Sequence, residues 1–162
     1  MAVKPIPEGY HTVTPYLVVD NGSAAIDFYK KAFGAHEVMR MEAPGGKIAH
    51  AEIKIGDSMV MLSDEMPGTG QRSPKSLGGV GTGVMLYVPD ADAVFKQATA
   101  AGAKVEMPIA DQFWGDRYGK LTDPFGHSWS VATHKEDVAP EEMKRRTKEA
   151  MAKMAQTHKA SS

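Results

Sequence analysis

DNGSAAIDFYKKAFGA (residues 20–35) and PDADAVFKQATAAGA (residues 89–103) can be superimposed at an offset of 68 residues, which aligns the Gly-Ala pair at 34–35 with the pair at 102–103. Farther along the chain, IGDSMVML (55–62) corresponds to FGHSWSVA (125–132) at an offset of 70 residues. Two similar segments at a nearly fixed offset indicate an internal repeat. The chain therefore reads as two copies of one unit of about seventy residues.

Each copy has the pattern of a β-α-β-β-β unit. An apolar run rich in β-branched residues precedes each helix, and a glycine follows each helix as a C-cap. KIAHAEIKI (47–55) alternates, so we expect Ala49, Ala51, Ile53 and Ile55 on one face and His50, Glu52 and Lys54 on the other. The other predicted strands are 12–20, 36–43 and 58–64 in the first unit, and 83–90, 104–110, 117–122 and 128–134 in the second.

Length and composition narrow the functional classes. The chain has 162 residues, 42% of them hydrophobic, with no cysteine and a net charge of -1. A nearly neutral chain has no long-range field to attract nucleic acid, and the missing cysteines exclude disulfides, a thiol nucleophile and thiolate zinc sites. No apolar run is long enough for a membrane span, and residues 1–10 do not resemble a signal peptide, so we expect a cytoplasmic protein.

The expected organisation is a single domain over 1–162. The first unit covers 11–65, a Gly-, Pro- and Ser-rich linker loop covers 66–82, and the second unit covers 83–138. A C-terminal helix and tail occupy 139–162, with Pro140 at the helix start and a narrow apolar stripe that includes Met143 and Met154.

Several motifs resemble the vicinal oxygen chelate superfamily, which includes the glyoxalases, bleomycin-resistance proteins and extradiol dioxygenases, and in particular its PhnB-like branch. The resemblance covers about 11–138 and rests on HTVTPYLVVD (11–20), AIDFYKKAFGA (25–35), HAEIKIGD (50–57), MLSDE (61–65), LYVPDADAVF (86–95), DQFWGDRYGKLTDPFGHSW (111–129) and ATHKEDV (132–138). It implies an α+β fold in which two βαβββ units form a curved mixed sheet around a cavity. It also implies a homodimer.

The resemblance implies a divalent metal held by His or Glu on the first and fourth strands of each unit. Those positions fall at or beside Thr14, Val60, Gly83 and Ser130, none of which is a good ligand for such an ion. We therefore expect no cofactor and no metal at the usual site, although a divalent metal elsewhere stays open.

His50 and Glu52 are the candidate catalytic residues. Two residues apart on a strand, they share a face and can act as a general base with a carboxylate partner, or as an alternative metal pair. The competing interpretation is a polar pair on a half-solvated sheet. Lys120 and Thr122 occupy the matching places in the second unit.

Most candidate ligand-binding residues lie in DQFWGDRYGK (111–120). Trp114 can form a stacking wall and Arg117 can clamp a carboxylate or phosphate, but the same block can equally be a bulged connection held by Asp–Arg pairs. The expected ligand-binding set is Tyr16, Tyr87, Gln112, Trp114, Arg117, Tyr118 and Lys120.

The function expected from these residues is binding of a small organic molecule, without nucleic-acid or membrane partners. Two alternatives stay open. One is a lyase or oxygenase-like enzyme with a site rebuilt around His50 and Glu52. The other is a scaffold protein that works through its C-terminal helix.

Overall fold

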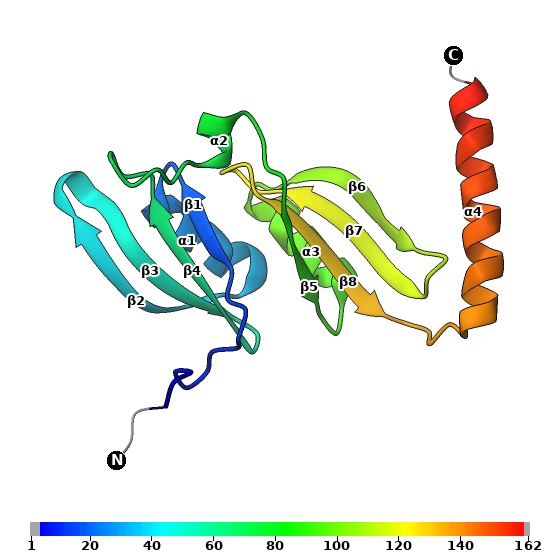
Figure 1. Cartoon of the computed structure of the whole chain (residues 1–162), viewed down its shortest axis with the longest axis horizontal. Helices are drawn as coiled ribbons and strands as arrows, with labels where there is room; N and C mark the ends of the chain where they lie inside the picture. The colour runs from blue at the N-terminus through cyan, green and yellow to red at the C-terminus, as the bar shows by residue number, and fades with distance from the viewer. Residues whose placement is uncertain (1–3, 161–162) are drawn as a thin grey trace.

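Each half of the chain folds into the predicted βαβββ unit (Figure 1). The computed structural model describes residues 4–160, with side chains for residues 4–156. The first unit comprises β1 (Tyr16–Val19), α1 (Gly22–Phe33), β2 (His36–Ala43), β3 (Lys47–Ile55) and β4 (Ser58–Asp64). The second comprises β5 (Gly83–Tyr87), α3 (Ala91–Ala101), β6 (Lys104–Asp111), β7 (Asp116–Thr122) and β8 (Ser128–His134).

The strands form two four-stranded mixed sheets, ordered β1-β4-β3-β2 and β5-β8-β7-β6. In each sheet the first strand of the unit pairs with the fourth in parallel, and the other neighbours are antiparallel. The predicted α+β fold of two βαβββ units is confirmed. Each unit keeps its own open sheet instead of sharing one continuous sheet.

The two long helices of the units begin and end through matching caps. The Asn21 side chain accepts a hydrogen bond from the backbone of α1, and Asp90 does the same for α3. Gly34 and Gly102 close the helices with positive φ angles of 65° and 116°, which glycine adopts without a steric cost. The helices pack against each other, α1 on β3 and β4 and α3 on β7 and β8, so each sheet has one covered face.

The predicted alternation of β3 is correct from His50 onward and wrong at Ala49. The register with β2 shifts between Met41 and Glu42, so that Met41 pairs with His50 and Glu42 with Ile48. Ala49 is thus the extra residue of a β-bulge, and Ile48 takes its place in the core with 1% of its surface exposed.

A buried carboxylate joins the two units. Asp123, in the DPFGH turn before β8, accepts hydrogen bonds from the Tyr29 hydroxyl of α1 (2.7 Å), from Trp129 Nε1 (2.9 Å), and from the backbone N–H groups of Phe125 and His127. Trp129 is fully buried. The turn therefore fixes the second unit against the helix of the first.

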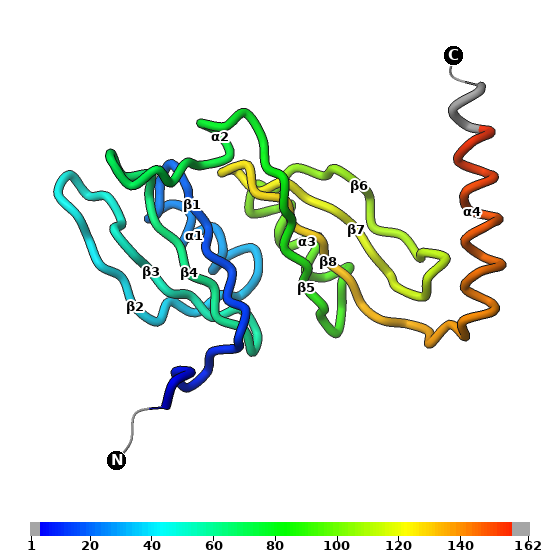
Figure 2. Tube along the Cα trace, in the orientation of Figure 1, coloured from blue at the N-terminus to red at the C-terminus, as the bar shows by residue number. Residues whose placement is uncertain are grey.

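Three shorter or peripheral elements complete the chain: the 3₁₀ turn η1 (Pro44–Gly46), α2 (Pro74–Leu77) and α4 (Pro140–Ala160). The predicted linker loop contains α2, which the sequence analysis missed. The trace in Figure 2 shows α4 along one edge of the molecule, beyond the β6–β7 turn and far from the N-terminal segment. Within the described residues, no helix combines the length and the apolar character that a membrane span needs.

Candidate functional site

The faces of the two sheets that point away from α1 and α3 carry most of the predicted site residues. On the first sheet, the register places Tyr16 and Glu52 beside Met61, and His50 beside Met41. This surface is the first open face, made of Tyr16, Met39, Met41, His50, Glu52 and Met61. On the second sheet, alternation defines the second open face, made of Met85, Tyr87, Met107, Tyr118, Lys120, Ser128 and Ser130.

The structure brings Tyr16, His50 and Glu52 together on the first open face. The Tyr16 hydroxyl lies 3.2 Å from His50 Nδ1, and His50 Nε2 lies 3.4 Å from Glu52 Oε1. If Nε2–H donates to the Glu52 carboxylate, Nδ1 is the acceptor for the phenol proton, so one imidazole tautomer satisfies both contacts. This phenol–imidazole–carboxylate chain can pass a proton to or from a ligand at Tyr16.

The N-terminal segment passes next to these three hydrogen-bonded side chains. A hollow of about 540 Å³ lies between the segment and the sheet, lined by Pro5, Ile6, Pro7, Tyr10, His11, Thr12, Thr14, Glu52 and Met61. Burial, reinforced by the neighbouring Glu52 carboxylate, raises the pKa of Tyr10 to about 12. Tyr10 therefore stays a neutral phenol beside Glu52.

The second open face is polar along β7 and β8. The Tyr118 hydroxyl lies 2.8 Å from Ser130 Oγ, and Lys120 lies between Met107 and Ser130 in the register. A hollow of about 270 Å³ opens here, lined by Val80, Gly81, Thr82, Gly83, Val84, Met85, Tyr118, Lys120, Ser128 and Ser130. Lys120 and Tyr118, two of the predicted ligand residues, thus share one hollow.

The buried carboxylate of Asp116 organises the other end of this sheet. It accepts hydrogen bonds from the Tyr87 hydroxyl (2.9 Å) and Trp114 Nε1 (3.1 Å), and its Oδ1 lies 2.8 Å from His134 Nδ1. Burial alone would raise the pKa of Asp116, but these three donors outweigh burial and lower it. Trp114 and Tyr87 are held by this carboxylate at the border of the second open face.

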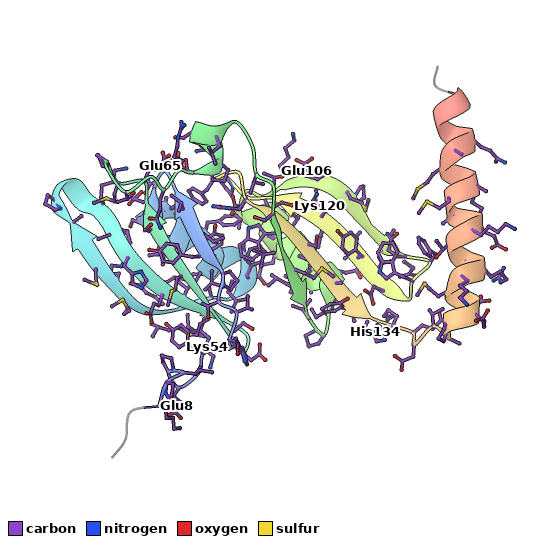
Figure 3. The ribbon with its side chains drawn as sticks, in the orientation of Figure 1. Glu8, Lys54, Glu65, Glu106, Lys120 and His134 are labelled. Carbon is purple, nitrogen blue, oxygen red and sulfur yellow. The ribbon has the colours of Figure 1, made fainter. Side chains whose placement is uncertain are left out.

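His134 lies between two carboxylates. Its Nδ1 contacts Asp116, and its Nε2 lies 2.9 Å from Asp137 Oδ1. The Asp116 contact, followed by the Asp137 contact, raises the pKa of His134. Figure 3 shows His134 at the end of the second sheet opposite Lys120.

Arg117 and Gln112 lie away from both open faces. The Arg117 guanidinium points to the helix side of β7, where it pairs with Asp92 of α3 and with Asp111 (3.1 Å). The Gln112 amide donates to the Ala110 carbonyl within the β6–β7 turn. The interpretation of this block as a bulged connection held by Asp–Arg pairs therefore describes Arg117 better than a ligand clamp does.

A third hollow, of about 590 Å³, lies at the seam between the two units. Its walls come from residues 11–15, the β3–β4 turn, Phe33 and β5. Tyr87 is the one predicted ligand residue that lines it. The predicted set is thus divided among separate hollows and does not surround a single cavity within one chain.

The positions that would hold the superfamily's usual metal do not fit it. Val60 is 3% exposed and faces the core, while its open-face neighbours on β4 are Met59 and Met61. Gly83 offers no side chain, and Ser130 is bound to Tyr118. His50 and Glu52 supply one imidazole and one carboxylate, whereas a catalytic zinc site needs three protein ligands. Among the residues with described side chains, no group of three or more His, Cys, Asp or Glu has the geometry of a metal site.

Comparison with known proteins settles the family. The family profile described as the Glyoxalase/Bleomycin resistance protein/Dioxygenase superfamily matches residues 10–131, from the segment before β1 to the middle of β8. The chain belongs to this superfamily. The α4 helix lies outside the matched residues.

Relatives within the superfamily agree with this assignment. The protein Rv0887c of Mycobacterium tuberculosis (strain H37Rv) is 46% identical over 134 residues, which cover 81% of this chain and 79% of the relative. The crystal structure of TioX from Micromonospora sp. ML1 is similar with a TM-score of 0.61 and 30% identity, over 76% of this chain and 98% of TioX. The PhnB protein from Bacillus cereus has the same fold, with a TM-score of 0.58, 20% identity and coverage of 76% and 99%.

Two features of the site were missed by sequence reasoning. Tyr10 lies in an irregular segment, where no periodicity shows that it lines the same hollow as Glu52. The methionines of the first open face, Met39, Met41 and Met61, lie on two strands, β2 and β4, and only the register shows that they share one face with His50. The alternation of Met61 with core residues along β4 is the one signal that was available from the sequence.

Proposed function

We propose that this superfamily member binds a small organic molecule on its open sheet faces, and that it does so without the usual metal. The observation that carries the proposal is the first open face, where methionine side chains surround a polar Tyr16–His50–Glu52 chain. Methionine is flexible and polarisable, so such a surface adapts to irregular apolar ligands, while a few polar groups orient them.

Binding of the neutral dye Nile red tests this proposal. We expect saturable binding that weakens about tenfold in Met61→Gln or Met85→Gln, one variant for each open face, because each change removes roughly a methionine's apolar contact. Met151→Gln is the control, since Met151 is 54% exposed on α4, away from both faces. Dye binding that is equal in all four proteins would refute the proposal.

We also propose that a second copy of the chain covers the open faces. Large exposed apolar side chains gather there, namely Tyr16, Met39, Met41, Met85, Tyr87 and Met107. Large apolar side chains that gather on an exposed face mark an interaction site more often than a free surface. A homodimer would close the faces over a ligand and shield it from water.

A second candidate function is a lyase or oxygenase-like enzyme, which the Tyr16–His50–Glu52 chain favours. With its proton received by His50, Tyr16 would act as a general base, and Glu52 would stabilise the charged imidazole. Elemental analysis of protein purified without chelator, together with His50→Ala, tests this candidate. Absence of stoichiometric Zn, Ni, Mn or Fe, with unchanged ligand binding in His50→Ala, would exclude it. Metal-dependent turnover of an aldehyde–thiol adduct or a catechol would instead overturn the binding-only proposal.

A further inference from the structure

The hollow on the second open face is lined by polar groups that donate hydrogen bonds. Its lining contains one cation, Lys120, and four hydroxyl groups, those of Thr82, Tyr118, Ser128 and Ser130. Among the described residues that line it, none is acidic. Hydroxyls and an ammonium group can all donate hydrogen bonds, so the hollow presents donors without a fixed negative charge.

The Lys120 ammonium is available for a ligand. It is exposed on the open face of β7, and within residues 4–156 it forms no ion pair. Arg117, three residues earlier, shows the contrast, because Asp92 and Asp111 already neutralise its guanidinium on the opposite face. An unpaired cation beside hydroxyl groups is suited to a small anion.

The Tyr118–Ser130 pair adds a directed donor. Their oxygens are 2.8 Å apart, so one hydroxyl donates to the other. The accepting hydroxyl keeps its own hydrogen, which can point to a ligand oxygen in the hollow. Hydrogen-bonded hydroxyl pairs are also polarised in the direction that strengthens this outer bond.

One carboxylate lies near the hollow without lining it. Glu106, on the neighbouring strand β6, accepts a hydrogen bond from Thr122 (3.1 Å) and lies 3.8 Å from Lys104 Nζ. Figure 3 shows Glu106 and Lys120 near the same end of the second sheet. The negative charge of Glu106 opposes binding of an anion at Lys120, so a change at Glu106 tests whether the bound group is negatively charged.

We propose that this hollow is an oxyanion subsite, in which Lys120 and the hydroxyls of Tyr118, Ser128 and Ser130 bind a carboxylate or phosphate group of the small organic ligand. The inference rests on the proposed ligand-binding function and narrows its ligands to acidic molecules. The apolar part of such a ligand would lie along Met85, which borders the same hollow.

The test is an NMR titration of isotope-labelled full-length protein with phenyl phosphate, benzoate and the neutral analogue phenol. We expect saturable shifts at the amides of Gly83, Lys120 and Ser130 with an acidic probe, and at least about tenfold weaker binding of phenol. The tighter of the two acidic probes identifies the group that the subsite takes.

Matched charge variants locate the site. Lys120→Gln should weaken the acidic probe about tenfold, and Lys96→Gln should leave it within about twofold, because Lys96 is exposed on α3 and lies outside the hollow. Glu106→Gln should strengthen binding and Ser130→Ala should weaken it. The subsite is refuted if Lys120→Gln binds as the parent does, or if phenol binds as tightly as the acidic probes.

These outcomes separate the subsite from the proposed function. Binding of phenol and Nile red without preference for an anion would leave the binding function intact and remove the oxyanion subsite. If none of the probes binds, both proposals fail together, whereas loss of Nile red binding alone refutes only the apolar surface.

Discussion

Among single residues, Asp123 ties the second unit to the first through the Tyr29 hydroxyl, a contact that no motif in the sequence suggests. Its buried carboxylate accepts two side-chain and two backbone hydrogen bonds. Oδ2 accepts from Tyr29 and Trp129, and Oδ1 accepts from the two backbone N–H groups. In Asp123→Asn, an NH₂ group replaces one of these oxygens and takes the acceptor away from its pair of donors, so we expect a loss of about 2 kcal/mol in the free energy of unfolding. Urea denaturation measures it. Asp57→Asn is the control, because the Asp57 carboxylate accepts from Ser58 at the exposed surface, and an equal loss there would contradict this role.

His134 predicts a pH dependence of stability. Its pKa in the folded protein is raised above the ordinary value of 6.5 by Asp116 and then Asp137. A raised folded pKa means that the stabilisation is complete below the unfolded pKa and is lost as the pH rises through the folded pKa. We therefore expect the parent to exceed His134→Asn in stability at about pH 6, with the difference shrinking by about pH 9. A difference in unfolding free energy that grows with pH would contradict this assignment.

Sequence reasoning at the level of residues succeeded where alternation applies. Strand periodicity placed His50 and Glu52 on one face, and the structure adds Tyr16 to them at hydrogen-bonding distance. Periodicity could not show the partner of Arg117, because the pairing with Asp92 joins residues 25 positions apart in two different elements. Burial of Asp116 was equally hidden, since its partners come from β5, β8 and a turn.

Among the secondary-structure elements, the fourth strand of each unit holds the start of its helix. Asp64 Oδ1 accepts from the Gly22 N–H (2.9 Å) and Oδ2 from the Ile48 N–H (2.7 Å), while Thr133 Oγ1 accepts from the Ala91 N–H (2.8 Å). These two contacts at the helix starts are related by an offset of 69 residues, so the same contact recurs with a carboxylate in one unit and a hydroxyl in the other. Gly22 must be a glycine here, since a Cβ would lie 2.7 Å from Ile48 Cβ.

The two side-chain contacts that hold the helix starts should differ in strength. Asp64→Ala removes a buried carboxylate and leaves two N–H groups unpaired, which should cost about 3 kcal/mol because bonds to a charged acceptor are the stronger ones. Thr133→Val removes the neutral bonds to the Ala91 N–H and the Val88 carbonyl and should cost about 1 kcal/mol. Thermal and urea unfolding measure both. Thr69→Val, in an exposed loop, should change stability by less than about 0.5 kcal/mol. Equal losses of unfolding free energy in Asp64→Ala and Thr133→Val would contradict the expected difference between the two contacts.

The bounds of the elements followed closely from sequence patterns, with informative exceptions. The strands 36–43, 47–55 and 58–64 were predicted at the bounds that the structure shows, because turn glycines and prolines separate them. The bulge at Ala49 was invisible, since apolar residues at 48 and 49 suit either register. The offset of 68 residues also fails at the helix starts, where the caps Asn21 and Asp90 are 69 apart, because α3 is one residue shorter than α1.

For the molecule as a whole, the two sheets lie side by side (Figure 1), and among residues 4–156 the N-terminal segment borders the first open face without a second layer covering either face. The sequence predicted a cavity between the halves, but it could not show that one chain alone leaves the faces apart. That arrangement depends on the contact between α1 and α3 and on the Tyr29–Asp123 bond, which are both long-range. We propose that a second copy of the chain covers these faces.

Two surfaces are candidates for the interface of such a dimer: the open faces and the helix α4. Met41 and Met151 are both 54% exposed, the first on the first open face and the second on α4, so they form a matched pair. A buried, unpaired carboxylate costs several kcal/mol at an interface, so Met41→Glu should give a monomer and Met151→Glu should leave a dimer. Light scattering coupled to size-exclusion chromatography measures the mass. Deletion of 139–162 should also leave a dimer; a monomer after this deletion, with a dimer retained in Met41→Glu, would transfer the interface to α4.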